Sequence, residues 1–365
     1  MNPARTGWTD GAEQGSAAAM RLLVLGGTLF LGRHVVDAAA ARGHEVATFT
    51  RGRTGTPPAG VLDLRGDRDD PPSLAAALDA ASWRPEVVVD TSCQSRAAAD
   101  QAAEALGRTA EGGGVRAYAL TSSLNAYAGW PPGPVRGDDD LTWTDDDASG
   151  DDGPGVDAYG PVKAHAERRL TAAVDGPVLL ARAGLVAGPL DPIGRLGWWL
   201  QRLARGGRVV VPAGLGQPLA LVDARDLADW LVRGVEEGWS GGVNATAPAG
   251  TTTLGSLLRT CAEVVGRPVG DGVDLVPVPD EELLAAGVEP WTDLPLWVPA
   301  GTATTLWDVR TDRADATGLV QRSVAETVAD TWAWLRLLDA PPAPPRGLPA
   351  PGLPADVEQR LLDAR

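Results

Sequence analysis

Short apolar runs alternate with helical segments over the first half of the chain. From Arg21 onward the apolar runs are RLLVLG, HEVATFT, PEVVVDTS, GVRAYALTSS and PVLLARAGLV, and segments such as GRHVVDAAAARG and QSRAAADQAAEALGR separate them. Continuous apolar strands that alternate with helices are typical of a parallel sheet covered on both faces. The pattern predicts an α/β fold with a doubly wound parallel sheet of about six strands.

Beyond Gly188 the alternation becomes irregular. RVVVPA predicts a further strand, and QPLALVDARDLADWLVRGVEEG predicts a strand followed by a helix. We expect a disordered leader over residues 1–20, a main domain over 21–188, a smaller lobe over 189–338 that returns some strands to the main sheet, and a proline-rich tail over 339–365. The tail segment PPAPPRGLPAPGLPA holds too much proline to pack as a helix and is expected to run extended over the surface.

Charge and cysteine content narrow the class of protein. The 365 residues carry a formal net charge of -16, so the surface should repel nucleic acid and anionic membranes. No stretch has the length of a membrane span and the first twenty residues lack the order of a signal peptide, which favours a cytoplasmic protein. Cys93 and Cys261 lie too far apart for a disulfide framework and are expected to be small buried hydrophobic residues.

Residues 137–153, GDDDLTWTDDDASGDDG, contain eight aspartates. Such a segment is expected to be a solvated loop. A second interpretation is a lid near an active site that disfavours strongly anionic substrates, because the segment ends shortly before Tyr159.

A glycine-rich turn joins the first predicted strand to the first predicted helix in LLVLGGTLFLGRHVV. Such a turn lets backbone amides and the helix N-terminus approach a pyrophosphate. Leu29 stands where a G-x-x-G-x-x-G fingerprint has glycine, and its side chain is expected to shift the cofactor or narrow its site. The alternative is a structural turn without a ligand. The candidate cofactor-binding residues of the turn are Gly26, Gly27, Thr28, Leu29, Phe30, Leu31 and Gly32.

The second predicted strand ends in FTRGRTG, where sites that prefer NAD usually have an acidic residue for the ribose hydroxyls. Arg51 and Arg53 follow this strand instead, and guanidinium groups suit a 2′-phosphate. We therefore expect NADP, with NAD as the alternative and solvated loop arginines as the competing interpretation. Asp67 in RGDRDD is a candidate acceptor for the adenine amino group, although an ordinary polar turn explains it equally well.

Tyr159 and Lys163 lie four residues apart in DAYGPVKAHA, so a helix would project both side chains from one face. Of the 32 basic residues, only Lys163 is a lysine. A phenol is a weak base at neutral pH, and a neighbouring ammonium favours the phenolate, so the pair can act as an acid/base catalyst that also binds cofactor ribose hydroxyls. An ordinary helix pair is the alternative.

Ser123 ends the apolar strand in ALTSSLNAYAG, and the carboxyl ends of parallel strands face the ligand crevice. Ser123 is therefore predicted to hydrogen-bond the substrate oxygen at which Tyr159 moves a proton. His34, His44 and His165 are scattered along the chain without a spacing that suggests a metal site. We expect structural histidines and no metal.

These segments together resemble the extended branch of the short-chain dehydrogenase/reductase superfamily, as an atypical member of the NAD-dependent epimerase/dehydratase family. The resemblance covers about residues 21–335 and rests on GGTLFLG, SSLNAY, YGPVK, ARAGLVAGP and LVDARDLADWLV. It implies a Rossmann-like dinucleotide-binding domain over 21–188 and a substrate-binding lobe over 189–338. It also implies a catalytic triad of Ser123, Tyr159 and Lys163, and a dinucleotide cradle at the three glycines of the turn. Leu29, and Ala183 where the family usually has proline, depart from its pattern.

We therefore expect an NAD(P)-dependent oxidoreductase that acts on a carbonyl or secondary alcohol of a small molecule, with hydride transfer at the cofactor and proton transfer at Tyr159. One alternative is a nucleotide-sugar epimerase or dehydratase that keeps its NAD(P) bound; the aspartate-rich segment argues against its diphosphate-bearing substrate. The other is a non-catalytic redox sensor that binds the dinucleotide as a regulatory ligand; the sole lysine argues against it.

Two tryptophan-rich segments lie in the second lobe. Trp198 and Trp199, with Arg195 nearby, are candidates to line the substrate pocket, although core packing is the favoured interpretation. Residues 289–299, EPWTDLPLWVP, are expected either to cover the same pocket or to form the contact of a homodimer.

Overall fold

The computed structural model describes residues 18–107, 114–131, 135, 137, 138, 140, 142–144, 156–345 and 347–365. Most of the expected leader and most of the aspartate-rich segment therefore lie outside the described residues. Met20 is an exception to the expected leader, because it is buried and its backbone N–H donates a hydrogen bond to His44 Nδ1 at 3.3 Å. The expectation of disorder is wrong for this residue.

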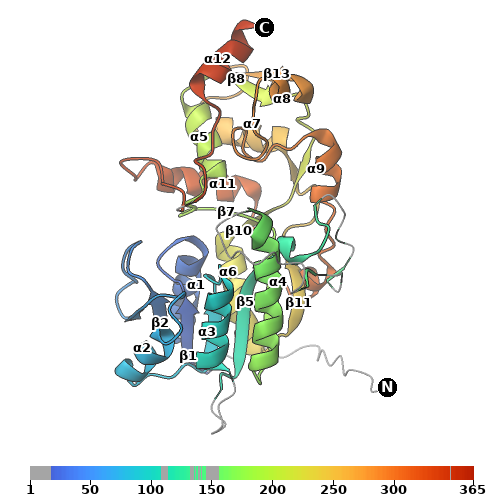
Figure 1. The fold of residues 1–365 in the computed structure, drawn as a ribbon. Coiled ribbons are helices and arrows are strands. Elements are labelled where there is room, and N and C mark those ends of the chain that lie inside the picture. Colours follow the sequence, from blue (N-terminus) through green and yellow to red (C-terminus); the bar gives the residue numbers. More distant parts are fainter. Residues whose placement is uncertain are drawn as a thin grey trace.

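Seven parallel strands form the main sheet, in the order β11-β6-β5-β4-β1-β2-β3 (Figure 1). Their bounds are β1 Arg21–Leu25, β2 Glu45–Thr50, β3 Leu62–Arg65, β4 Val87–Asp90, β5 Ala117–Ser123, β6 Val178–Ala183 and β11 Gly241–Ala245. The strand order reverses between β1 and β4, and ligands of such sheets bind beyond the carboxyl ends of the strands at the reversal. The doubly wound fold predicted from the apolar runs is confirmed.

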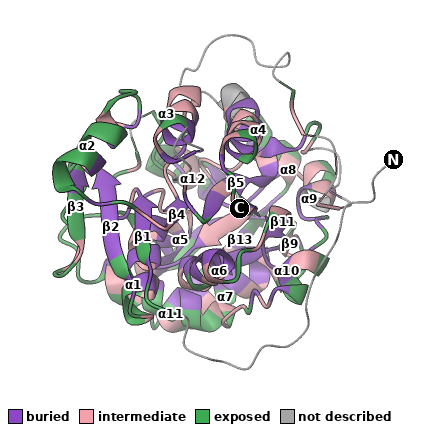
Figure 2. Ribbon diagram, turned by 90° about the horizontal axis from the view of Figure 1, so that it is seen from below, coloured by how far each residue is buried: buried purple, intermediate pink, exposed green. Residues whose placement is uncertain are grey.

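Helices cover both faces of this sheet, and Figure 2 shows buried strands between the two helical layers. On one face lie α1 Phe30–Ala41 and α6 Ala224–Glu237; on the other lie α2 Ser73–Ala81, α3 Arg96–Leu106 and α4 Val156–Ala173. Successive residues of β1 serve opposite cores, because Leu22 and Val24 join the cluster with α1 while Leu23 and Leu25 join the cluster with α2 and α3. Burial on both faces explains why the central strands are continuously apolar.

The second lobe lies beyond the carboxyl ends of the main strands (Figure 1). The chain enters it after β6, which ends at Ala183, by way of β7, which begins at Leu185. It contains three strand pairs: β7 Leu185–Ala187 with β10 Leu221–Asp223, β8 Gly207–Pro212 with β13 Val273–Val278, and β9 Pro218–Leu219 with β12 Thr252–Thr253. Its helices are α5 Arg195–Ala204, α7 Leu254–Val264, α8 Asp280–Ala285, α9 Ala300–Leu306, α10 Asp312–Ala316 and α11 Val324–Leu335. All of them except α10 surround one further hydrophobic core, whereas Ala314 of α10 joins the core formed with α1 and α6.

The tail ends in a helix that the sequence pattern did not predict. The helix α12, Ala355–Asp363, begins at the last residue of the proline-rich segment. Leu361 and Leu362 are buried in the core of the second lobe, and Glu358 pairs with Arg202 of α5 at 2.9 Å. A short amphipathic helix after the prolines thus anchors the tail.

Both cysteines are free and buried, as expected. Burial raises the pKa of the Cys93 thiol to about 12, so little of the reactive thiolate exists at neutral pH. Within the part of the chain that the structure describes, no helix is both long and apolar enough to cross a membrane.

Candidate functional site

The glycine turn between β1 and α1 has the shape of a phosphate cradle. Gly26 and Gly27 have φ of 107° and 106°, conformations that side chains rarely adopt. A Cβ on Gly32 would lie 2.6 Å from the backbone nitrogen of Gly27, so only glycine lets α1 approach the turn this closely. Leu29 caps α1 without a side-chain hydrogen bond, which leaves the first amides of the helix without this partner. These features fit a dinucleotide pyrophosphate.

Position 29, where the fingerprint has glycine and this chain has Leu29, does not require glycine in this structure. Its φ of -138° lies in the extended region that any residue adopts, and 39% of its surface is exposed. The neighbouring Thr28 Oγ1 lies 2.8 Å from Thr54 Oγ1, which ties the turn to the loop that carries Arg53. The effect of Leu29 on cofactor placement stays a prediction.

Gly32→Ala is expected to weaken dinucleotide binding about tenfold, because the added methyl group must push α1 away from the turn, a distortion that costs about 1–3 kcal/mol. The measurement is a fluorescence titration with NADPH. Gly216→Ala is the matched control, since a Cβ there would meet nothing within 4 Å. Unchanged affinity in the Gly32 variant would contradict the cradle.

Arginines gather where β2 and β3 end. Arg51 and Arg53 are both exposed. Arg65, which is paired with Thr50 in the sheet register, donates a hydrogen bond to Thr50 Oγ1 at 3.2 Å, pairs with Asp63 and covers Gly52. The sequence pattern missed Arg65; the signal that could have found it is the alignment of neighbouring strand ends.

Asp67 lies in a polar turn after β3. Its backbone N–H donates to Ser73 Oγ at 2.9 Å, and its Oδ1 accepts a hydrogen bond from the Asp69 N–H at 3.2 Å. These contacts are those of an ordinary Asx turn. The adenine contact of Asp67 stays a prediction.

The residue after Asp67 makes a buried ion pair that the sequence analysis missed. Arg68 donates to both carboxylate oxygens of Asp90 at 3.0 and 2.9 Å, and the Tyr118 hydroxyl donates to Asp90 Oδ2 at 2.8 Å. Burial alone would raise the pKa of Asp90, but the charge and hydrogen bonds of Arg68 outweigh it and hold that pKa below its ordinary value. The pair fixes the carboxyl end of β4.

Lys163 is buried at the carboxyl ends of β4 and β5. Its ammonium donates to the carbonyl oxygens of Cys93 at 2.8 Å and Thr121 at 3.1 Å, and it lies 5.5 Å from the centre of the Tyr159 ring. Only 2% of its surface is exposed. Two of the three N–H groups are thus fixed, and the third has no partner among the residues that the structure describes. It fits a cofactor ribose hydroxyl.

Tyr159 and Ser123 are brought to the same end of the sheet. Trp143 Nε1 donates to the Asn125 carbonyl oxygen at 2.9 Å, and a Cβ on Gly160 would lie 2.7 Å from the same indole nitrogen, so α4 packs closely against the segment after Ser123. Tyr159 is half-buried, and across the described chain no side chain or backbone group hydrogen-bonds its hydroxyl.

Ser123 is already engaged with Asn125. Its Oγ donates to Asn125 Oδ1 at 3.1 Å and accepts from the Asn125 N–H at 3.2 Å. To donate a hydrogen bond to a substrate oxygen, the Ser123 hydroxyl must give up its hydrogen bond to Asn125 Oδ1. The predicted catalytic residues therefore converge, and their roles stay proposals.

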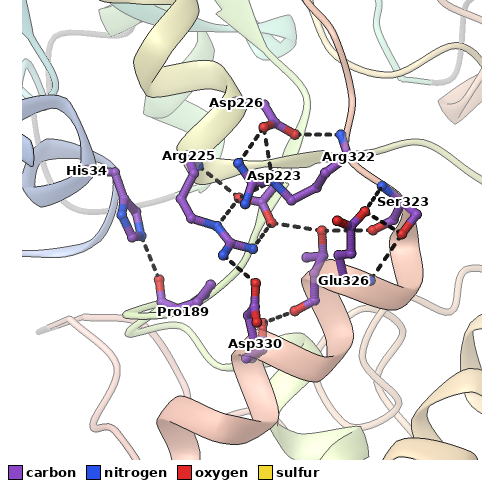
Figure 3. A network of polar contacts seen from close by, with 11 residues as sticks. His34, Pro189, Asp223, Arg225, Asp226, Arg322, Ser323, Glu326 and Asp330 are labelled. Carbon is purple, nitrogen blue, oxygen red and sulfur yellow. Dashed lines mark hydrogen bonds and ion pairs between the residues drawn. The ribbon is translucent and has the colours of Figure 1, made fainter. Parts of the chain in front are cut away.

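One hydrogen bond joins α1 to the segment after Gly188, and a separate polar network lies near it (Figure 3). His34 of α1 bonds the Pro189 carbonyl oxygen at 3.0 Å, and burial lowers its pKa. Nearby, the Asp223 carboxylate is held by Arg225 at 2.8 Å and by Thr327 of α11 at 2.7 Å. The His34 hydrogen bond fixes the segment after Gly188 beside α1, and the Asp223 network ties the start of α6 to α11.

The other histidines and the aspartate-rich segment have structural partners. His44 Nε2 hydrogen-bonds Glu236 Oε1 at 2.9 Å, and His165 Nδ1 lies 3.3 Å from a guanidinium nitrogen of Arg96. Within the described ranges, no three or more histidine, cysteine, aspartate or glutamate side chains are grouped as metal ligands would be. Asp138, in the described part of the acidic segment, accepts a hydrogen bond from the Asn244 N–H at 2.7 Å. The lid interpretation concerns residues mostly outside the described ones.

The tryptophans of the second lobe differ in their contacts. Trp199 is fully buried and donates to the Pro295 carbonyl oxygen at 2.7 Å, and Trp198 leaves no room for a side chain at Gly352. Both serve packing, the interpretation that the sequence favoured. Trp291, from residues 289–299, instead stacks against Arg195, whose Cζ lies 5.0 Å from the ring centre.

Comparison with known proteins agrees with this geometry. The model of the NAD dependent epimerase/dehydratase family matches residues 22–245. A curated Streptomyces protein named 3-diazoavenalumate denitrifying reductase is 31% identical over 240 residues, which cover 62% of this chain and 76% of that protein.

Two solved structures share the fold. The Bordetella bronchiseptica enzyme WbmH in complex with NAD+ has a TM-score of 0.64 at 15% identity and covers 88% of this chain and 100% of its own. The Thermus thermophilus UDP-glucose 4-epimerase complex with NAD has a TM-score of 0.61 at 19% identity and covers 87% of this chain and 99% of its own. The chain belongs to the NAD-dependent epimerase/dehydratase family, the extended branch of the short-chain dehydrogenases/reductases.

Proposed function

We propose that this protein is an NADP-dependent reductase of a small-molecule carbonyl group, with Tyr159 as the proton donor, Lys163 as its electrostatic partner and Ser123 as the group that orients the substrate oxygen. The observation that carries the proposal is the environment of the Lys163 side chain. The only lysine of the chain is buried, fixed by two backbone carbonyl groups and adjacent to a tyrosine whose hydroxyl has no hydrogen-bond partner among the described residues. The name of the Streptomyces relative, a reductase, supports net reduction.

The three side chains divide the chemistry of one proton transfer. Bound NADPH would supply the hydride to the carbonyl carbon. The Tyr159 hydroxyl donates its proton to the carbonyl oxygen, and the Lys163 ammonium stabilises the phenolate that this leaves, until a proton from solvent restores the phenol. Ser123 Oγ donates to the same oxygen and so orients the carbonyl group for the hydride that bound NADPH would supply.

The choice of NADP over NAD rests on charge at the ends of β2 and β3. Arg51, Arg53 and Arg65 lie there, and β2 ends in Thr50 rather than in an acidic residue. Guanidinium groups pair with phosphate through charge-assisted hydrogen bonds. Asp63 partly neutralises Arg65, so the two loop arginines are the main candidates for the 2′-phosphate.

Replacing Arg51 and Arg53 together by alanine is expected to weaken binding of 2′,5′-ADP about tenfold to a hundredfold and binding of 5′-AMP less than about twofold. Calorimetric titration of the two nucleotides measures this without a substrate. Arg84→Ala, a control far from the strand ends that is 59% exposed at its side chain, should leave both affinities unchanged. Equal affinity of the wild type for the two nucleotides would favour NAD instead.

The function itself is tested by the fate of the reduced cofactor. With a carbonyl substrate, a reductase consumes NADPH in proportion to the alcohol formed, and absorbance at 340 nm follows it. An epimerase that returns the hydride would convert a nucleotide sugar with no net change in NADPH. A redox sensor would bind NADPH and convert neither class, and each of the last two results refutes the proposal.

A further inference from the structure

Arg195 is a partly buried cation that makes no direct ion pair with any residue that the structure describes. It begins α5, and its guanidinium lies against the Trp291 ring at 5.0 Å. Among the residues that the structure describes, no carboxylate lies within ion-pair distance of it. The deeply buried arginines differ, because each meets a carboxylate at 2.7 to 2.9 Å: the pairs are Arg68 with Asp90, Arg182 with Glu167 and Arg202 with Glu358.

The acid nearest in the sequence, Asp191, acts on Arg195 only from beyond ion-pair distance. Asp191 Oδ1 accepts a hydrogen bond from the Ile193 N–H at 2.9 Å, and burial raises the pKa of this carboxyl group above its ordinary value. Burial lowers the pKa of Arg195, but an arginine stays protonated in proteins. Because removing a charge from water is unfavourable by several kcal/mol unless a partner contacts it, a cation with no direct partner among the described residues favours a ligand of opposite charge.

A second donor without an acceptor lies in the same cluster. The rings of Trp291 and Trp307 are 6.1 Å apart, and Trp307 is only 5% exposed. The Nε1–H group of Trp307 is buried with no hydrogen-bond partner in the described part of the chain. An unsatisfied buried donor costs about 1–3 kcal/mol. A positively charged donor beside a second donor without a described partner favours a ligand group that accepts hydrogen bonds and carries negative charge, which is an anion.

The backbone around this cluster is strained. Leu190, in the loop before α5, has φ of 68°, and Trp291 has φ of 66°. A residue with a side chain rarely adopts such angles, and they recur at ligand sites where the surrounding structure holds them. Both loops that flank Arg195 therefore carry the strain expected of a binding site.

Arg195 also lies within electrostatic range of the phenol of Tyr159, the proposed proton donor. A ligand group held by Arg195 would therefore belong to the molecule whose carbonyl group reacts at Tyr159. α5 and residues 289–299 hold no second unpaired cation, since Arg202 is paired with Glu358. One guanidinium matches one carboxylate in a two-point contact, whereas a diphosphate carries more charge than this site neutralises.

We propose that Arg195, supported by the indole N–H of Trp307, binds a carboxylate of the substrate, so that the enzyme reduces carbonyl groups of organic acids. This substrate class rests on the proposed reductase function of Tyr159. Residues 289–299 thereby serve the substrate site through Trp291.

The test uses the full chain and three probes: 4-formylbenzoate, its neutral methyl ester, and UDP as the diphosphate probe. Calorimetry with the NADP-saturated protein gives binding of each probe. A separate assay of NADPH consumption gives turnover of the two aldehydes. The wild type should bind 4-formylbenzoate at least tenfold more tightly than the ester. Arg195→Met should abolish this preference by raising KM for the acid while kcat stays within about threefold. Arg195→Lys, which keeps the charge and loses the planar fork, should retain part of it.

Two further variants separate the possible outcomes. Arg205→Met removes an exposed arginine at the other end of α5 and should behave as wild type. Tyr159→Phe should lose turnover but keep the preference for the acid, so an Arg195-dependent preference without any turnover refutes only the reductase function. Equal binding of acid and ester by the wild type, an unchanged preference in Arg195→Met, or Arg195-dependent binding of UDP alone overturns the carboxylate site.

Discussion

Tyr159→Phe is expected to lower kcat about a thousandfold with any carbonyl substrate that the wild type reduces, because proton donation by a positioned side chain contributes about 10²–10⁴-fold to such reactions. The phenyl ring keeps the packing beside Lys163, and no hydrogen bond is lost within the described chain, since none reaches the hydroxyl. NADPH consumption under saturating substrate measures the effect.

Nucleotide binding provides the control for this variant. The thermal midpoint should stay close to wild type, and the affinity for NADPH should fall by no more than about tenfold, because at most one hydrogen bond to a cofactor ribose hydroxyl is lost. A variant that folds, binds NADPH and retains more than about a tenth of the wild-type kcat would assign the proton transfer to another group.

Asp90→Ala is expected to lower the free energy of unfolding by about 3–5 kcal/mol, because it leaves the Arg68 guanidinium buried without its counter-charge. Tyr118 also loses its hydrogen-bond acceptor. Urea denaturation followed by tryptophan fluorescence measures the difference. Asp79→Ala removes one member of an exposed ion pair with Arg84 and should cost less than about 1 kcal/mol.

The same pair predicts a pH dependence. The pKa of Asp90 is lower in the folded chain than in the unfolded chain, so the ionised carboxylate stabilises the fold at pH values above the unfolded value of about 4. This stabilisation is lost as the pH falls toward the folded pKa. The difference in stability between wild type and Asp90→Ala should therefore shrink below about pH 4, and a difference that stays constant down to pH 2 would contradict the assignment.

The central strands were predictable from sequence, and the edges of the sheet were not. β1, β4 and β5 are covered on both faces and read as continuous apolar runs. The edge strand β11 begins with two glycines, and only Leu64 of the edge strand β3 is buried. Hydrophobic periodicity arises from burial, so strands that are half covered and short leave a weak signal.

The candidate site shows the same division between local and distant contacts. The glycine turn and the Tyr159 and Lys163 pair were predictable because a turn or a single helix fixes their spacing. The pairs Arg68 with Asp90 and Arg195 with Trp291 join residues 22 and 96 positions apart, so only the folded chain brings them together. The carbonyl groups that hold Lys163 belong to the backbone and leave no trace in side-chain chemistry.

The return of the chain from the second lobe to the main sheet has a consequence for engineering. A gene fragment that stops at Gly188 would encode every cofactor motif, yet it would lack α6 and β11. In the intact molecule these elements bury Leu179, Ala181 and one face of α1. The residues up to Gly188 are therefore not expected to fold as an independent nucleotide-binding domain. Chimeras with relatives should keep residues 21–245 of one parent intact in the main sheet and exchange only surface loops of the second lobe.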